Sequence, residues 1–189
     1  FVSLGGVRIT HDLAWQGWEA ARILSGVYPL IGQPSSVFLD NPPLMGYIQA
    51  IPLFIWPSPW SIFIFITALN TLAIPFIFSA VEQVFGRRIA VLSTLLFVIN
   101  PWVAHFSRMT WTQGLLPFFL AVMFWGWLPT FAKTGTDEAD NSQLLARRYL
   151  RGWISFTAML QTYIMAFSML LPATLLTLVF WRKLPKKQL

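Results

Sequence analysis

The chain has 189 residues, of which 56% are hydrophobic and only 11% are charged, and its mean hydropathy is +0.62. Soluble domains are about 25% charged, so this composition argues against an ordinary soluble domain and predicts an integral membrane protein. The net charge of +6 comes from Lys and Arg residues that lie between hydrophobic runs, which indicates membrane orientation rather than nucleic-acid binding. The absence of cysteine excludes disulfides, thiolate catalysis and Cys-ligated zinc.

Residues 1–59 are predicted to form an outer-face loop with two short interfacial helices. After a short Gly-containing start at 1–11, residues 12–25 have a helical rhythm that stops at Gly26. Residues 27–42 are a loop rich in Pro, Gly and Ser, and 43–56 are apolar but too short to cross a membrane. Because this polar region is expected outside the cell, although no signal peptide precedes it, we expect a transmembrane helix upstream of the sequence.

Residues 60–189 are predicted to be an all-α scaffold of about five transmembrane helices. The first covers 60–84, and a short second span starts at Ile89 and ends near Pro101 or runs on toward His105. The third, fourth and fifth spans are expected at 112–131, 149–162 and 164–181, with a hydrophilic loop at 132–148.

The basic residues predict which end of the spans faces inward. If the Gly86–Arg88 turn is inside, ten Lys and Arg fall on that side, and only Arg8, Arg22 and Arg108 fall outside. This is the excess of basic residues expected for cytoplasmic loops. It places Asp12, Asp40, His105 and Arg108 on the outer side.

Asp12, with His11 beside it, is the first candidate for chemistry. A carboxylate at the membrane interface can act as a general base toward an acceptor hydroxyl or amine. It can equally serve as the cap of the helix that follows, and the residues alone support both roles evenly.

Five further residues are candidates for substrate binding: Arg108, Asp40, Asn41, His11 and His105. Arg108 follows a Pro-Trp turn and suits a phosphate, although an Arg that reaches lipid headgroups is slightly favoured on position alone. Asp40 and Asn41 precede a rigid Pro42-Pro43 corner, which can also be a simple helix start. His105 is a weaker candidate, and the spacing of His11, Asp12 and His105 gives no support for a metal site.

The order of these features resembles the GT-C superfamily of membrane glycosyltransferases, in particular the bacterial relatives of protein O-mannosyltransferases and lipid A aminoarabinose transferases. The resemblance covers nearly the whole chain through short motifs in a fixed order. The matching positions are Asp12, Ala14, Ala20 to Gly26, Leu39 to Leu44, Phe85 to Arg88, Asn100-Pro101, Phe106 to Arg108 and Leu115 to Phe119.

The resemblance implies an inverting transferase in the inner membrane of a bacterial cell envelope, with its active face outside. Its donor would be a polyprenyl-phosphate-linked sugar, with no further cofactor. Asp12 would be the general base, and Arg108 would bind the donor phosphate. The partners would be the lipid bilayer and other membrane proteins.

Three positions depart from the family pattern. Leu13 follows Asp12 where many members have Glu, Asn41 replaces a Lys before the double proline, and Gln161-Thr162-Tyr163 replace a Thr-Lys pair. These departures favour an alternative function, a non-catalytic structural subunit of a membrane complex that keeps the scaffold, whereas the retained Asp12, Asp40 and Arg108 favour the enzyme. A close approach of Asp12 to Arg108 across an open cavity would favour the enzyme.

Overall fold

A computed structural model describes residues 2–4, 7–9, 11–35, 38–132 and 142–181. The fold is helical apart from one antiparallel hairpin, β1 (Val2–Leu4) and β2 (Val7–Ile9), which opens the chain where a single entering strand or helix was expected. Two short helices follow, α1 (His11–Leu24) and α2 (Leu44–Ile55). They match the two predicted interfacial helices closely, and Gly26 takes a positive φ of 92° just after α1.

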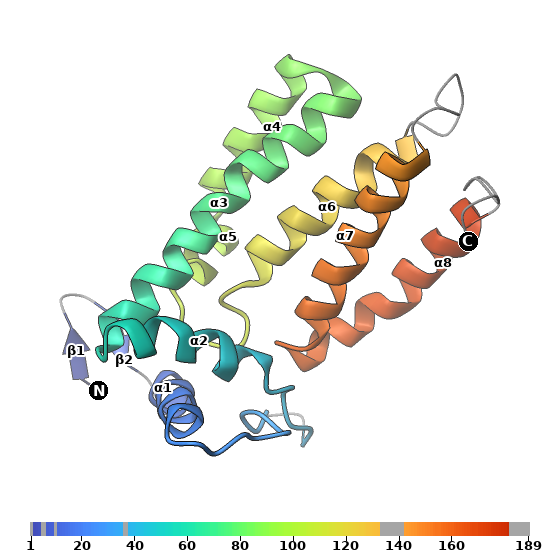
Figure 1. The fold of residues 1–189 in the computed structure, drawn as a ribbon. Coiled ribbons are helices and arrows are strands. Elements are labelled where there is room, and N and C mark those ends of the chain that lie inside the picture. The colour runs from blue at the N-terminus through green and yellow to red at the C-terminus, as the bar shows by residue number, and fades with distance from the viewer. Residues whose placement is uncertain (1, 5–6, 10, 36–37, 133–141, 182–189) are drawn as a thin grey trace.

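The remaining helices form an array of up-and-down elements (Figure 1). In chain order they are α3 (Pro59–Phe85), α4 (Arg87–Ile99), α5 (Pro101–Phe106), α6 (Leu116–Ala132), α7 (Ser142–Leu160), the 3-10 helix η2 (Ile164–Met169) and α8 (Leu170–Trp181). Helices α1 and α2 lie across one end of this array, and the α3–α4 turn lies at the other end (Figure 1).

Local signals explain where the helices begin and end. Ser58 caps α3 by accepting a hydrogen bond from the Trp60 backbone N–H, with Pro59 as the first helical residue. Gly86 ends α3 with a φ of 81°. Asn100 breaks the next helix, because its side chain accepts from the N–H groups of Trp102 and Val103 and so starts α5 anew.

The core lies where α3, α6 and α7 pack against α2. Its buried residues include Met45, Ile62, Ile66, Leu115, Phe119, Met123, Trp127 and Phe156. Helices α6 and α7 approach very closely at Gly126 and Gly152. A Cβ atom on Gly126 would lie 2.5 Å from the Arg148 carbonyl oxygen, so only glycine allows this contact.

The prediction of about five membrane spans is not supported by helix length. Among the described residues, α3 alone is long and apolar enough to cross a membrane. The break at Asn100 limits α4 to 13 residues, α6 has 17, and η2 interrupts the last predicted span. Helix α7 has 19 residues but carries three arginines. Most of the hydrophilic loop predicted at 132–148 lies outside the described residues, and its last part belongs to α7.

Candidate functional site

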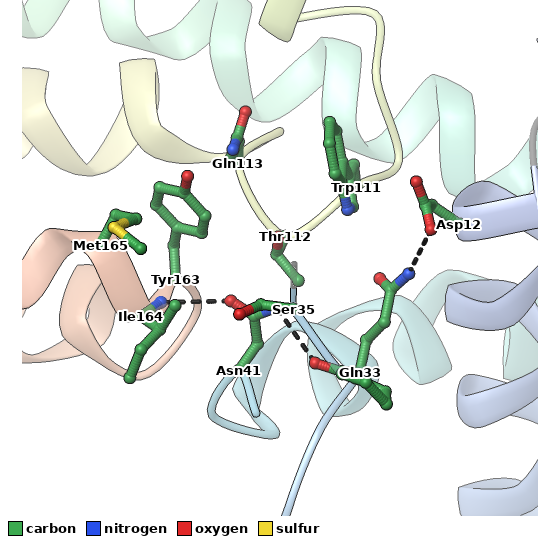
Figure 2. A pocket seen from close by; sticks show the side chains of 11 residues that line it. Asp12, Gln33, Ser35, Asn41, Trp111, Thr112, Gln113, Tyr163, Ile164 and Met165 are labelled. Atoms are coloured by element: carbon green, nitrogen blue, oxygen red, sulfur yellow. Dashed lines mark hydrogen bonds between the residues drawn. The ribbon is translucent and has the colours of Figure 1, made fainter. Parts of the chain in front are cut away.

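A polar pocket of about 260 Å³ opens where α1, the 33–41 loop, the segment after α5 and the α7–η2 junction meet. Figure 2 shows that its side chains come from four stretches that are far apart in the sequence. The lining residues are Asp12, Gln33, Pro34, Ser35, Asn41, Trp111, Thr112, Gln113, Tyr163, Ile164 and Met165.

Asp12 supplies the single carboxylate of the pocket. Because α1 begins at His11, Asp12 lies inside the first helical turn and not at the position before the helix, where a cap residue stands. The half-buried side chain accepts a hydrogen bond of 2.9 Å at Oδ1 from Gln33 Nε2. Gln33 Oε1 in turn accepts from Gln16 Nε2 at 2.9 Å. Asp12 therefore has a fixed orientation at the pocket wall.

The loop that carries Gln33 is closed on itself by backbone pairing. Asn41 N–H donates to the Gln33 carbonyl at 2.9 Å, and Gly32 N–H donates to the Asn41 carbonyl at 2.8 Å. A Cβ atom on Gly32 would lie 2.7 Å from the Pro42 carbonyl oxygen, so the return of the chain requires glycine. This pairing holds Gln33 in place beneath α1.

Asn41 joins this loop to the far side of the pocket. Its Nδ2 donates to the Gln33 carbonyl at 3.0 Å, and its Oδ1 accepts from the Ile164 backbone N–H at 3.2 Å (Figure 2). The residue is 4% exposed, so both bonds are shielded from solvent. The lysine that the family pattern has at this position could bind an anion. The Asn41 side chain instead binds the backbone of Gln33 and of η2.

The pocket chemistry is polar and almost uncharged. None of the eleven lining residues is Lys or Arg. Gln33, Ser35, Asn41, Thr112, Gln113 and Tyr163 contribute amide and hydroxyl groups beside the Trp111 ring. Thr112 Oγ1 is buried with no hydrogen-bond partner in the described part of the chain. The Gln33 and Asn41 amides are bonded within the protein, and the Gln113 amide and Tyr163 hydroxyl beside Asp12 suit a ligand with hydroxyls better than a multiply charged anion.

An apolar cavity of about 330 Å³ lies on another side of α1. It is lined by Leu13, Ala14, Gly17 and Ala21 of α1, Leu53 of α2, Pro59, Ile62 and Phe63 of α3, and Thr110. A third cavity of about 200 Å³ lies between α3 and α4–α5, and it contains Arg108 and Ser107. The segment from Ser107 to Gln113 therefore borders all three cavities.

The structure brings together only some of the predicted site residues. Asp12 and Asn41 line the polar pocket. Asp40, His11 and His105 are exposed and do not line it. His11 lies beside the Trp15 ring and His105 beside the Phe106 ring.

Arg108 is exposed and lines the third cavity, so Asp12 and Arg108 do not share one cavity, the arrangement that would have favoured the enzyme. The Gln161–Tyr163 turn, which stands where the family has a Thr-Lys pair, borders the pocket and also binds the backbone of α2. Tyr163 lines the pocket, while the Gln161 carbonyl accepts from Leu44 N–H at 3.1 Å.

Gln33 and Thr112 were not predicted. Gln33 sits in a Pro- and Gly-rich loop with no motif around it, and Thr112 follows an aromatic turn. A buried amide in a loop can be recognised as a site residue only once its hydrogen-bond partner across the fold is known.

Helix α1 also buries a second carboxylate, Glu19, which was not predicted as a site residue. Its side chain is 4% exposed and packs against Gly46 of α2, and Oε2 has no hydrogen-bond partner within the described ranges. Burial raises the pKa of Glu19, and Arg22 one turn along α1 partly opposes this rise. Within the described ranges, no group of three or more His, Asp or Glu residues lies close enough to hold a metal ion.

Comparison with family models, with curated proteins and with solved structures finds no match for this chain.

Proposed function

We propose that this chain is a GT-C-like membrane glycosyltransferase, which moves a sugar from a polyprenyl-phosphate-linked donor to an acceptor at the outer membrane face. The observation that carries the proposal is the arrangement of three cavities around residues 107–113. One cavity is polar and holds Asp12, one is apolar and reaches Thr110, and one contains Arg108. A lipid-linked sugar has the same three chemical parts: sugar, apolar chain and phosphate.

The short chain distance between these cavities supports the proposal. Arg108 and Trp111 are three residues apart, so their Cα atoms are separated by at most about 11 Å. A phosphate near Arg108 would place a directly attached sugar within reach of the polar pocket. The uncharged amide and hydroxyl groups there match the hydroxyls of a sugar and its acceptor.

In the proposed reaction, Asp12 takes the proton of the acceptor hydroxyl or amine. The acceptor atom then forms a bond to the anomeric carbon of the sugar, on the face opposite the phosphate. The bond between that carbon and the phosphate oxygen breaks, and the polyprenyl phosphate leaves with the electron pair. Arg108 stabilises the phosphate by hydrogen bonding and charge, and the anomeric configuration inverts.

The surface of the array supports insertion into a membrane, which we propose to be the bacterial inner membrane. Exposed apolar side chains cover α4 and α8, including Leu92, Leu96, Leu171 and Leu178, as expected of faces that contact lipid. In the five-span arrangement that we propose, α4–α5 and η2–α8 each count as one broken span, because helix breaks are tolerated where neighbouring helices cover them.

The ends of the array support an outer active face. Arg87 and Arg88 follow the α3–α4 turn, and Arg147, Arg148 and Arg151 lie in the first half of α7. Both elements begin at the end of the array opposite α1 and α2 (Figure 1). Basic residues mark the cytoplasmic side, so the end that carries Asp12 would face outward.

Two observations favour the second candidate, a non-catalytic structural subunit. Asp12 and Arg108 line different cavities, and Asn41 is fully engaged in hydrogen bonds where a donor-binding Lys is expected. In that case the polar pocket would be a remnant of the scaffold, and the partners would be other membrane proteins.

A transfer assay tests the proposal. The intact chain in lipid nanodiscs is mixed with a panel of polyprenyl-phosphate-linked hexoses and aminopentoses and with outer-face envelope acceptors, and released polyprenyl phosphate is measured. We expect acceptor-dependent release with at least one donor, and a higher KM for that donor in Arg108→Gln. If no donor on the panel is bound or turned over, the enzyme proposal fails and the structural subunit takes its place.

A further inference from the structure

The hydrogen bonds around Asp12 form a directed chain of side-chain amides. Gln16 Nε2 donates to Gln33 Oε1 at 2.9 Å, and Gln33 Nε2 donates to Asp12 Oδ1 at 2.9 Å. Gln16 and Gln33 are 1% and 4% exposed, so water does not compete for these bonds. Asp12 and Gln16 are four residues apart and therefore lie on one face of α1.

The carboxylate sets the direction of the whole chain. An ionised carboxylate only accepts hydrogen bonds, so Gln33 has to turn its NH₂ group toward Asp12. Its oxygen then faces Gln16, which has to turn its own NH₂ group toward Gln33. As a result, Gln16 Oε1 points away and is buried with no hydrogen-bond partner among the described residues. A buried unpaired acceptor has lost its bonds to water, so this arrangement costs free energy in the folded protein.

The backbone of Gln33 is held by two further hydrogen bonds. Its backbone carbonyl accepts from both the N–H and the Nδ2 of Asn41. Asn41 is in turn bound to the first residue of η2. The amide chain therefore connects Asp12 to a frame built from two separate parts of the fold.

We propose that Gln33 and Gln16 are positioning residues, which fix the Asp12 carboxylate through Oδ1 and leave Oδ2 for the proton of the acceptor. The inference rests on the proposed function for the identity of that proton, but the positioning itself is measurable without any transfer activity. Oδ2 has no hydrogen-bond partner among the described residues (Figure 2). A positioned base needs one oxygen held and the other one available.

The test replaces each amide by methionine, which has a similar length but no donor, in the intact chain in nanodiscs. Carboxyl groups are labelled with a water-soluble carbodiimide and an amine, and Asp12, Asp40 and Glu82 are read separately by mass spectrometry. Asp40 and Glu82 are exposed and serve as internal references. Gln83→Met is the matched control, because Gln83 Nε2 donates to the Ser79 carbonyl in α3, away from the pocket.

We expect Gln33→Met to raise the labelling rate of Asp12 about five-fold relative to both references, since one hydrogen bond to a charged group is lost. Gln16→Met should raise it less, because the Gln33–Asp12 bond can persist without its support. Gln83→Met should leave it unchanged. In the transfer assay, Gln33→Met and Gln16→Met should each lower kcat by about 10- to 100-fold, with little change in KM for the donor.

The outcomes separate the positioning from the function. If Asp12 labelling rises but the wild-type chain transfers no sugar, the positioning stands and the glycosyltransferase proposal fails. If Asp12 labelling is unchanged in both variants, the positioning is overturned even if the protein is a transferase. If Gln33→Met does not fold, Gln16→Met decides the question, because it leaves the Gln33 backbone frame in place.

Discussion

Asn41 Oδ1 accepts a hydrogen bond from the backbone N–H of Ile164 at 3.2 Å, although the two residues are 123 positions apart. The bond joins the loop that ends at α2 to the start of η2. Leu44 N–H, bound to the Gln161 carbonyl at 3.1 Å, adds a second tie between the same two regions. Asn41 and Ile164 both line the polar pocket, so the first of these bonds ties two parts of its wall together.

Replacing Asn41 by Ala is therefore expected to loosen the pocket and the α7–η2 junction together. The substitution removes one buried and one partly buried hydrogen bond and leaves the Ile164 N–H unpaired, so we expect a loss of about 1–3 kcal/mol in the free energy of unfolding. Unfolding in detergent measures the change. The neighbouring Asp40→Ala is the control and should stay within about 0.5 kcal/mol of wild type, because Asp40 is exposed. Equal losses in both variants would contradict the role of Asn41.

The α6–α7 contact makes a second prediction. Gly126→Ala would bring a Cβ to 2.5 Å from the Arg148 carbonyl and 2.6 Å from the Gly152 nitrogen, which forces the two helices apart. We expect a loss of about 1–3 kcal/mol from overpacking, seen as a lower Tm in detergent. Gly17→Ala is the matched control, since nothing lies within 4 Å of a Cβ there. It should stabilise α1 by about 0.5–1 kcal/mol, as expected for Gly to Ala inside a helix. A Gly126→Ala protein as stable as wild type would show that the helices do not pack this closely.

Glu19 predicts a pH dependence of stability. Burial raises its pKa in the folded state above its value in the unfolded chain, so the folded state holds the proton more tightly. The stabilising effect is complete below the unfolded pKa and is lost as the pH rises through the raised folded pKa. Glu19→Gln keeps the shape but has no titrating proton. We expect this variant to lose less stability than wild type as the pH rises through that range. Parallel stability curves for the two proteins would show that Glu19 is not buried as the structure has it.

Much of the fold was predictable because its helix ends are marked by local residues. Pro57 and Pro59 separate α2 from α3, Gly86 ends α3, and Asn100-Pro101 interrupts the following helix. These signals act within one turn of the chain, so sequence alone predicts them. The lengths of the helices were not predictable in the same way. Hydropathy does not show that Asn100 and η2 divide apolar runs into shorter helices.

Of the candidate catalytic and binding residues, Asp12 and Asn41 line the polar pocket. The position of Asp12 at the start of an outer helix marked it as a candidate, but its partner Gln33 lies 21 residues away in a loop without a motif. Arg108 matched a family pattern, yet the chain turns between Arg108 and Trp111, and the two line separate cavities. Such separations depend on how loops cross between helices, which no local pattern encodes.

In the proposed function, Asp12 is the base of the transfer reaction. The most direct test of this role is the transfer rate of Asp12→Asn under saturating donor and acceptor. Asparagine keeps the size of the side chain and still offers Oδ1 to Gln33, but it cannot take a proton at neutral pH. We predict a fall in kcat of at least about 100-fold, with the thermal unfolding of the protein unchanged. An Asp12→Asn protein that transfers sugar at the wild-type rate would contradict the assignment.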